Sequence, residues 1–328
     1  MPTEKPPPCV LVTGGAGFIG SHFSERLLQR GSAVVCLDSF NDYYDPSVKR
    51  RNLESLLKRP DSSYRLIEGD ILDADLLKKL FAENRFDAVV HLAARAGVRP
   101  SIREPGLYQK VNLEGTVNLL EMSVKHGVPR FLFASSSSVY GANSKVPFSE
   151  EDPVNRPVSP YAATKRAGEL LAYTFHSLYG LSVHCLRFFT VYGPRQRPDM
   201  AIHKFTRLIA EGKEIPLFGN GTSRRDYTFI DDIIDGMERS LERCKGYAIY
   251  NLGESQTIEL LQLIRLLEKA LGKKANLRFL ADQPGDVPVT FADIVNARRD
   301  LGYDPKTPIE RGIPAFIDWF NTSIQRLS

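Results

Sequence analysis

The sequence predicts an α/β protein whose core is a doubly wound parallel sheet, and three observations support this fold class. Short apolar runs alternate with helical patterns through about the first 190 residues. A glycine-rich segment, Thr13–Gly20, joins the first apolar run to the first helical pattern. After Gly193 the pattern becomes irregular, with loops rich in Pro, Gly and Arg between helices. Repeated strand–helix units form parallel sheets covered by helices on both faces, and the irregular part predicts a smaller C-terminal unit.

Six short segments are expected to form the sheet. Each is almost continuously apolar, as parallel strands buried on both faces are, and none shows the alternation of a sheet with one solvated face. The expected strands are Cys9–Thr13, Ala33–Leu37, Tyr64–Glu68, Ala88–Leu92, Phe131–Ser135 and Val183–Phe188.

Helices are expected between and after these strands, and glycine marks the end of two of them. Gly31 and Gly127 stand where a helix commonly ends on a glycine. Ser159 followed by Pro160 fits an N-cap and the first helical position. The predicted helices are Gly17–Arg30, Glu104–His126, one that opens at Ser159, Ala201–Glu211 and Glu259–Leu271.

Composition and charge argue against several functional classes. The 328 residues are 42% hydrophobic and 25% charged, as in ordinary globular proteins, and the net charge of +4 is too small to predict nucleic acid or a membrane surface as a partner. MPTEKPPP lacks the apolar stretch of a signal peptide, and no apolar run approaches the roughly 20 residues of a membrane span, so a cytoplasmic location is expected. No metal site is expected, because four cysteines without ligand-like spacing predict buried free thiols: Cys9, Cys36, Cys185 and Cys244.

The glycine-rich segment is typical of a site for the pyrophosphate of a dinucleotide. Gly14, Gly17 and Gly20 allow a tight turn, a close approach of backbone to phosphate, and close packing of helix on strand. The N-terminus of the following helix offers free N–H groups and the positive end of its dipole. Because the segment follows an apolar strand, it predicts a Rossmann-type sheet that binds a dinucleotide. Together with Tyr161 and Lys165, about 140 residues further on, it predicts a nicotinamide cofactor.

Residues after the next three strands are expected to hold the rest of this cofactor. Asp38 ends the second strand, where a carboxylate binds the adenosine ribose and repels a 2′-phosphate, so NAD is favoured over NADP; the alternative is a turn or helix cap. Asn41 is expected to assist it. Asp70-Ile71 is expected to lie against the adenine or to form a simple turn. The small residues in Leu92-Ala93-Ala94 suit a backbone that passes close to the cofactor.

Tyr161 and Lys165 predict acid–base chemistry coupled to hydride transfer. They are four residues apart at the start of a helix, so both side chains project from one face. A free tyrosine has a pKa near 10, and a neighbouring ammonium and a positive nicotinamide ring favour the phenolate. Lowering that pKa by about 3 requires roughly 4 kcal/mol. Lys165 is also expected to hold the nicotinamide ribose.

The run Ser135–Ser138 ends the fifth strand, at the edge where doubly wound sheets place ligands. One of these serines can bind the reacting oxygen of a substrate and share its proton with Tyr161. Serines in this position also form simple turns, so the run leaves open which of them acts.

Together these segments resemble the extended short-chain dehydrogenase/reductase family, in particular the nucleotide-sugar 4-epimerases, from Val10 almost to the C-terminus. The motifs are TGGAGFIG at 13–20, Asp38, GDI at 69–71, HLAA at 91–94, SSSSVYG at 135–141, SPYAATK at 159–165 and RRDYTFIDD at 224–232. The resemblance implies NAD as cofactor and Ser136, with Tyr161 and Lys165, as the catalytic residues. It also implies that the cofactor contacts Phe18, Ile19, Asn112, Phe188 and Val191.

The resemblance further indicates a UDP-sugar that carries a carboxylate. FFTVYGP at 188–194, RPDM at 197–200, DYYD at 42–45 and GVR at 97–99 are similar to UDP-glucuronate 4-epimerases. Galactose-type enzymes usually carry Asn at the position of Thr190, and a threonine hydroxyl with an arginine fork suits a uronic acid. The uronate enzymes often carry Trp-Gly at the position of Arg195-Gln196, so the identity of the sugar stays open. An arginine in this loop, Arg197 included, could also be a solvated surface residue, which leaves the same question open.

The remaining substrate contacts are implied in the same way. Arg225 matches a diphosphate-binding arginine, 216–219 the segment beside the uracil, and 283–286 a loop that closes over the nucleotide. The implied substrate-binding residues are Arg99, Ser136, Ser137, Ser138, Thr190, Arg197, Pro216, Phe218, Arg225, Gln283 and Asp286.

The expected domain organisation follows from these assignments. Residues 1–8 are expected as a disordered tail and 9–190 as the NAD-binding domain, with 228–253 returning to it. Residues 191–227 and 254–328 are expected as the substrate-binding domain. Family members assemble through the helices near 104–126 and 161–179, which implies a homodimer.

The serine turn also narrows the reaction. Dehydratases and sugar-acid decarboxylases of the family carry a carboxylate where this chain has Ser137 and Ser138, so reversible oxidation at carbon 4 is favoured. The main expectation is UDP-glucuronate 4-epimerization, with UDP-glucose/UDP-galactose 4-epimerization as the nearest alternative. A net oxidoreductase of nucleotide sugars and a catalytically silent NAD-dependent sensor are further alternatives.

Overall fold

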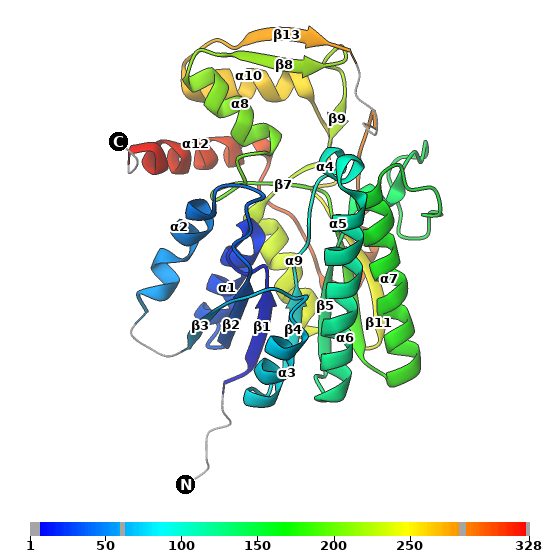
Figure 1. Ribbon diagram of the computed structural model, residues 1–328. Helices are drawn as coiled ribbons and strands as arrows, with labels where there is room; N and C mark the ends of the chain where they lie inside the picture. Colours follow the sequence, from blue (N-terminus) through cyan, green and yellow to red (C-terminus); the bar gives the residue numbers. More distant parts are fainter. Residues whose placement is uncertain (1–6, 60–62, 282–286, 326–328) are drawn as a thin grey trace.

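A computed structural model describes residues 7–59, 63–281 and 287–325, and its largest sheet has seven strands in the order β11-β6-β5-β4-β1-β2-β3 (Figure 1). All neighbouring strands in it are parallel. The order reverses between β1 and β4, and doubly wound sheets bind ligands in the crevice at such a point. The strands are β1 (Cys9–Thr13), β2 (Ala33–Asp38), β3 (Tyr64–Glu68), β4 (Ala88–His91), β5 (Arg130–Ser136), β6 (Ser182–Phe188) and β11 (Tyr247–Leu252).

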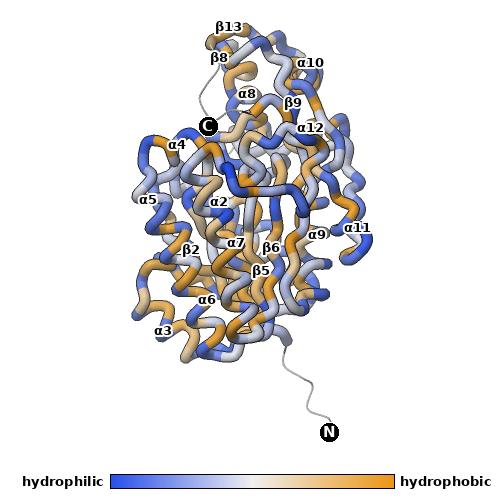
Figure 2. The backbone as a smooth tube through the Cα atoms, turned by 90° about the vertical axis from the view of Figure 1, so that its right-hand side faces the viewer, coloured by the Kyte–Doolittle hydropathy of each residue, from blue (hydrophilic) through white to orange (hydrophobic). Residues whose placement is uncertain are grey.

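The predicted doubly wound parallel sheet is confirmed, and helices cover both of its faces. On one face α1 (Phe18–Gln29) packs between α2 (Pro46–Leu57) and α9 (Ile230–Glu242). On the other face α6 (Gly115–Lys125) lies between α3 (Ala74–Glu83) and α7 (Pro160–Tyr179). Each face has its own apolar core, and Figure 2 shows the apolar stretches, in orange, along interior strands such as β5.

Two helix boundaries place residues of the site. Ser159 is the N-cap of α7, where its hydroxyl accepts a hydrogen bond of 3.1 Å from the backbone N–H of Ala162. The segment 104–126, expected as one helix, is divided into α5 (Pro105–Gln109), a π-helical turn η1 (Lys110–Glu114) and α6, preceded by the short α4 (Val98–Arg103). π-helical turns inside α-helices are frequent at functional sites.

A smaller unit lies beyond the carboxyl ends of the sheet strands (Figure 1). In it β8 (Glu214–Phe218) pairs in parallel with β13 (Asn276–Leu280), although 57 residues separate them. Short pairs, β7 (Thr190–Tyr192) with β10 (Tyr227–Phe229) and β9 (Arg224–Arg225) with β12 (Ile258–Glu259), connect this unit to the sheet. Its helices are α8 (Ala201–Ala210), α10 (Leu260–Leu271) and α12 (Ile309–Gln325), whereas α11 (Val295–Leu301) packs against β11 and α9 of the sheet.

The described residues contain neither a membrane-spanning helix nor a cluster of metal ligands. None of the helices there combines the length and the apolar character needed to cross a membrane. The same ranges contain no group of three or more His, Cys, Asp or Glu side chains that could hold a metal ion. Residues 1–6, which include most of the expected tail, lie outside the described part of the chain.

Candidate active site

The glycine-rich loop between β1 and α1 forms a cradle that side chains would fill. Gly14 has a φ of +68°, and a Cβ atom there would lie 2.7 Å from the backbone nitrogen of Ala93. At Gly20 a Cβ atom would lie 2.3 Å from the carbonyl oxygen of Gly14. Both distances are shorter than real Cβ contacts, so only glycine leaves this backbone in place. The open N-terminus of α1 next to the loop fits a dinucleotide pyrophosphate.

Asp38, at the end of β2, is buried and already has three hydrogen-bond donors. Its carboxylate accepts from the backbone N–H groups of Ala16 and Phe40, at 3.1 and 3.0 Å. The ammonium of Lys49 donates to it at 2.8 Å, and both side chains line the same cavity. The carboxylate therefore fixes the turn after β2 and brings a cation to the place where the ribose is expected.

A cavity of about 420 Å³ runs along the carboxyl edge of the sheet from this pair to Tyr161. It brings together nearly all of the predicted cofactor residues, which lie far apart in the sequence. Of these, it is lined by Gly14, Gly17, Phe18, Ile19, Gly20, Asp38, Asn41, Asp70, Ile71, Leu92, Ala93, Ala94, Tyr161, Lys165, Phe188 and Val191.

Asn112 is the predicted cofactor residue that does not line this cavity. It lies in the π-helical turn, 3% exposed, and its side chain binds the backbone of Arg95 on both sides. Its Oδ1 accepts from the Arg95 N–H at 2.8 Å, and its Nδ2 donates to the Arg95 carbonyl and to Thr164. Asn112 thus fixes the segment after β4, and Arg95 in that segment does line the cavity.

Tyr161 and Ser136 meet at the inner end of the cavity. The two side chains are hydrogen-bonded, and Ser136 Oγ also accepts from the backbone N–H of Ser138 at 3.2 Å. Burial raises the pKa of Tyr161, while the bond with Ser136 and the charge of Arg197 act in the opposite direction. The protein alone therefore does not lower this pKa as expected, and the phenolate needs additional positive charge.

Lys165 lies one turn further along α7 and is 5% exposed. Its ammonium donates a hydrogen bond of 2.7 Å to the carbonyl oxygen of Ala134 and lies over the ring of Phe133. Burial lowers the pKa of Lys165 to about 8, and the charge of Glu169 counteracts this change.

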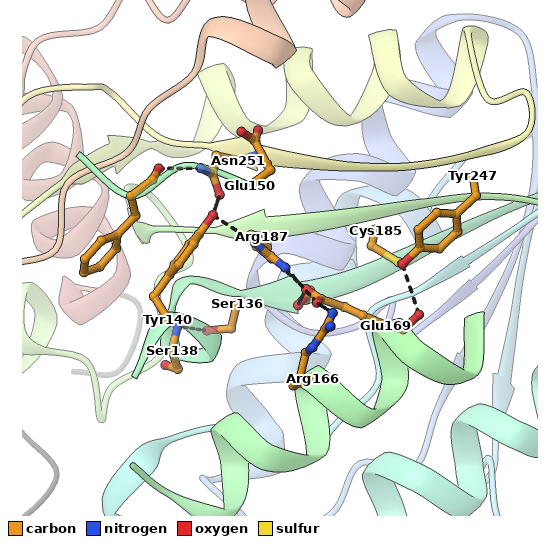
Figure 3. A network of polar contacts seen from close by, with 12 residues as sticks. Ser136, Ser138, Tyr140, Glu150, Arg166, Glu169, Cys185, Arg187, Tyr247 and Asn251 are labelled. Carbon is orange, nitrogen blue, oxygen red and sulfur yellow. Dashed lines mark hydrogen bonds and ion pairs between the residues drawn. The ribbon is translucent and has the colours of Figure 1, made fainter. Parts of the chain in front are cut away.

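The four serines of the run 135–138 have different contacts in the structure, although the sequence did not distinguish their roles. Ser135 also lines the larger cavity, but its hydroxyl donates a 2.6 Å hydrogen bond to Glu169, which belongs to the buried network of Figure 3. Ser136 meets Tyr161. Ser137 and Ser138 line a second cavity of about 190 Å³.

This second cavity collects several of the predicted substrate residues. Thr190 from β7 and Arg225 from β9 line it with Ser137 and Ser138. Arg225 also donates to the carbonyl oxygen of Arg224 at 2.9 Å. The second cavity therefore combines hydroxyl groups and a guanidinium with the apolar side chains of Val98, Phe148, Val158 and Val287.

Arg99 in α4 and Phe218 in β8 bring the sheet and the smaller unit into contact. The Arg99 guanidinium carbon lies 4.6 Å from the centroid of the Phe218 ring. Pro216 lies on the same strand, β8. The predicted residues Gln283 and Asp286 lie outside the described part of the chain.

The loop after β7 contains Arg195 and Gln196, the two residues at which this chain departs from the Trp-Gly of many uronate enzymes. Arg195, with a φ of +63°, is directed to α1, where its guanidinium pairs with Glu25 at 2.9 Å. Gln196 is 1% exposed and its amide donates to the carbonyl oxygen of Val191. Neither residue lines either cavity, so the departure from Trp-Gly lies outside both of them.

Arg197 itself lines the larger cavity. Its guanidinium forms two hydrogen bonds with Asp199, at 2.9 and 2.7 Å, and lies over the ring of Tyr43. It is therefore held inside the site by a carboxylate and an aromatic ring.

Lys49 lines the larger cavity, although the sequence did not predict it as a site residue. Lys49 lies on α2, a helix with many charged residues that reads as solvated. The signal was its spacing, because Lys49, Asn52, Leu53 and Leu56 form the buried face of that helix.

Comparisons with known proteins agree with this geometry. The model of the NAD dependent epimerase/dehydratase family matches residues 10–253. UDP-glucuronate 4-epimerase 4 of Arabidopsis thaliana is 47% identical, over 95% of this chain and 75% of that protein. The UDP-glucuronate 4-epimerase of Thermodesulfobacterium geofontis is 45% identical, over 96% of this chain and 97% of that protein.

A solved structure is similar over nearly the whole chain. The crystal structure of a UDP-glucuronic acid 4-epimerase from Bacillus cereus, in complex with UDP-glucuronic acid and NAD, matches with a TM-score of 0.90. It is 39% identical and covers 96% of this chain and 99% of that chain. The predicted resemblance is confirmed, and the chain belongs to the NAD-dependent epimerase/dehydratase family of extended short-chain dehydrogenase/reductases.

Proposed function

We propose that the protein is an NAD-dependent epimerase that interconverts UDP-glucuronate and UDP-galacturonate at carbon 4. The observation that carries this proposal is the meeting of Ser136 and Tyr161 in a cavity that fits a dinucleotide, with the next two residues of the serine turn, Ser137 and Ser138, lining a second cavity. The similarity to UDP-glucuronate 4-epimerases from a plant and a bacterium supports the choice of sugar.

The protein's own residues account for the proton transfers. Bound NAD supplies the acceptor for the hydride from carbon 4 and gives the hydride back. Tyr161 removes the proton of the C4 hydroxyl, and Ser136 orients that oxygen. Lys165, held by Ala134, contributes the positive charge beside the nicotinamide ribose. The 4-keto sugar then turns about its diphosphate linkage, so that the hydride returns to the opposite face of carbon 4, and Tyr161 returns the proton to the C4 oxygen.

The uronate carboxylate is assigned to two groups. Thr190 lies in the small cavity with Ser137 and Ser138, and hydroxyl groups there can donate to a carboxylate. Arg197 lines the larger cavity with Tyr161, close enough for its charge to act on the phenol, and provides a planar fork of donors. Arg225 is assigned to the diphosphate and Phe218 to the uracil.

The two units are assigned different tasks. Residues 9–190, with 228–253, hold the cofactor, and residues 191–227 and 254–328 hold the nucleotide sugar. A homodimer through α7 is supported by exposed apolar side chains on that helix, which are Leu170, Tyr173, Leu178 and Tyr179.

Proton NMR of the purified protein with each sugar nucleotide tests the proposal directly. Incubation with UDP-glucuronate, without added reductant, is expected to give the anomeric signals of UDP-galacturonate, and UDP-glucose is expected to stay unchanged. Conversion of UDP-glucose alone would instead make this a neutral-sugar epimerase. NADH that accumulates with product would indicate a net oxidoreductase.

Asp38→Asn is expected to change the cofactor preference. The variant removes a charge that accepts from Lys49 at 2.8 Å, so the lysine becomes available to a 2′-phosphate. Losing one hydrogen bond to a charged group costs about 1.5–3 kcal/mol, so the NAD dissociation constant should rise roughly tenfold or more, while that of NADP rises less or falls. Titration calorimetry with both cofactors measures the ratio. Asp75→Asn, on an exposed residue that does not line the cavity, serves as the control; an equal ratio in both variants would contradict the prediction.

A further inference from the structure

Glu169 stands one helical turn beyond Lys165 and two beyond Tyr161, on the same face of α7. Its side chain is fully buried, and its carboxylate accepts four hydrogen bonds (Figure 3). Oε1 accepts from Ser135 Oγ at 2.6 Å and from Arg187 Nε at 2.8 Å. Oε2 accepts from Arg187 Nη2 and Arg166 Nη1, each at 2.9 Å. The proposed chemistry uses none of these contacts.

From Arg187 the network continues to the other end of the serine turn. Arg187 is 1% exposed, and its Nη1 donates to the hydroxyl of Tyr140 at 3.0 Å. That hydroxyl donates to Asn251 Oδ1 at 2.6 Å, and the Asn251 amide donates to the carbonyl oxygen of Phe148. Ser135 and Tyr140 flank the turn that contains Ser136. The network therefore holds both ends of the turn, because its members come from β5, α7, β6 and β11.

The carboxylate also acts on the buried cation beside it. Lys165 donates to the Ala134 carbonyl, and its pKa is lowered to about 8 by burial, against which the charge of Glu169 works. The groups around Lys165 are Tyr161 and Glu169 on α7, the Phe133 ring and Ala134 carbonyl on β5, and His91 on β4. His91 is neutral, because burial and the charge of Lys165 lower its pKa to about 3.

We propose that Glu169 is a positioning residue of the epimerase: its carboxylate fixes the turn that presents Ser136 and keeps Lys165 charged during turnover. This inference rests on the proposed function for its assay. A buried carboxylate with two arginines could also serve stability alone, since breaking such a pair by removing one partner is strongly destabilising. A pH profile separates the two roles, because loss of stability does not move the titration of Lys165.

The test compares the Glu169→Gln and wild-type holoenzymes by measuring kcat for the epimerization across pH 6 to 10. A cation whose pKa is raised by an anion loses its proton at lower pH once that anion is neutral. The alkaline limb of the Glu169→Gln profile is therefore expected at lower pH than that of the wild type, with a fall in kcat of about tenfold or more at pH 8 and an unchanged KM for the sugar. An alkaline limb at the wild-type pH would overturn the proposal.

Two further variants separate charge from stability. Arg166→Gln removes a partner of the same carboxylate but leaves the carboxylate charged. Its melting temperature should fall, and because a positive charge near Lys165 is lost its alkaline limb should stay in place or move to higher pH. A limb that moved to lower pH, as in Glu169→Gln, would overturn the proposal. Glu169→Asp keeps the charge but shortens the reach to Ser135 and Arg187. This variant is expected to have a lower kcat than the wild type, with its alkaline limb at the wild-type pH. It replaces Glu169→Gln in the test if that variant does not fold. A kcat equal to that of the wild type would contradict a positioning role for Glu169.

The outcome also distinguishes this inference from the proposed function. The wild-type enzyme is first assayed with UDP-glucuronate and with UDP-glucose. If it converts only UDP-glucose, the proposed substrate is wrong, and the profiles are measured with that sugar. If UDP-glucuronate is converted and the limb does not move in Glu169→Gln, only the role of Glu169 is wrong.

Discussion

Tyr161→Phe is expected to abolish turnover while leaving NAD bound. The change removes the phenol that meets Ser136, and the rest of the ring can stay in place against Tyr108. A positioned acid–base group contributes about 10²–10⁴ to the rate, so kcat for UDP-glucuronate should fall by at least about a hundredfold. The loss is measured by NMR, and cofactor binding by calorimetry.

A matched tyrosine on the same helix provides the control for this variant. Tyr179→Phe removes one hydroxyl from a side chain that is 58% exposed at the far end of α7, and kcat should stay at the wild-type value. Retained epimerase activity in Tyr161→Phe would show that another group moves the proton. Loss of NAD binding in that variant would show instead that the phenol has a structural role.

Gly20→Ala is expected to remove cofactor binding. The new methyl group would lie 2.3 Å from the Gly14 carbonyl oxygen and 2.7 Å from the Gly15 Cα, and both are backbone atoms that cannot move without displacing the loop. Overpacking of this kind costs about 1–3 kcal/mol in stability. It also displaces the N–H groups that fit the pyrophosphate, so the NAD dissociation constant should rise by more than about tenfold.

Thermal unfolding with and without NAD measures this effect. A ligand that binds only the folded protein raises the melting temperature, so the wild type should gain several degrees and Gly20→Ala almost none. Gly106→Ala is the control, because a Cβ atom there meets no other atom within 4 Å. An equal gain in Gly20→Ala and the wild type would mean that the loop does not hold the cofactor.

The sheet and the cofactor cavity could be predicted because their signals are local. A buried parallel strand is an apolar run, and the loop at Gly14 and Gly20 has a backbone that only glycine allows. The pairing of β8 with β13 could not be read in this way, because it joins segments 57 residues apart and depends on tertiary packing. The seventh strand, β11, was also absent from the expected strands, since its neighbour β6 lies far earlier in the chain.

In the site, the residues missed were charged groups that are buried. Lys49 and Glu169 read as solvated helix positions, since most lysines and glutamates are exposed. Their burial depends on partners from other elements, Asp38 for Lys49 and Arg187 for Glu169, and no local pattern records such pairs. The different contacts of Ser135, Ser136 and Ser138 could not be predicted either, because they depend on the direction of each side chain at the end of β5.

The two-part layout of the cleft has an evolutionary consequence. The glycine loop, Tyr161 and Lys165 all precede β7, whereas Thr190, Arg197 and Arg225 lie in β7 and after it. On the proposed assignment of these three residues to the sugar nucleotide, substitutions in the later segments can change which sugar is accepted while the glycine loop, Tyr161 and Lys165 stay the same. A lineage that duplicated such a gene could diversify its substrates one half at a time, and each intermediate would keep a working redox centre.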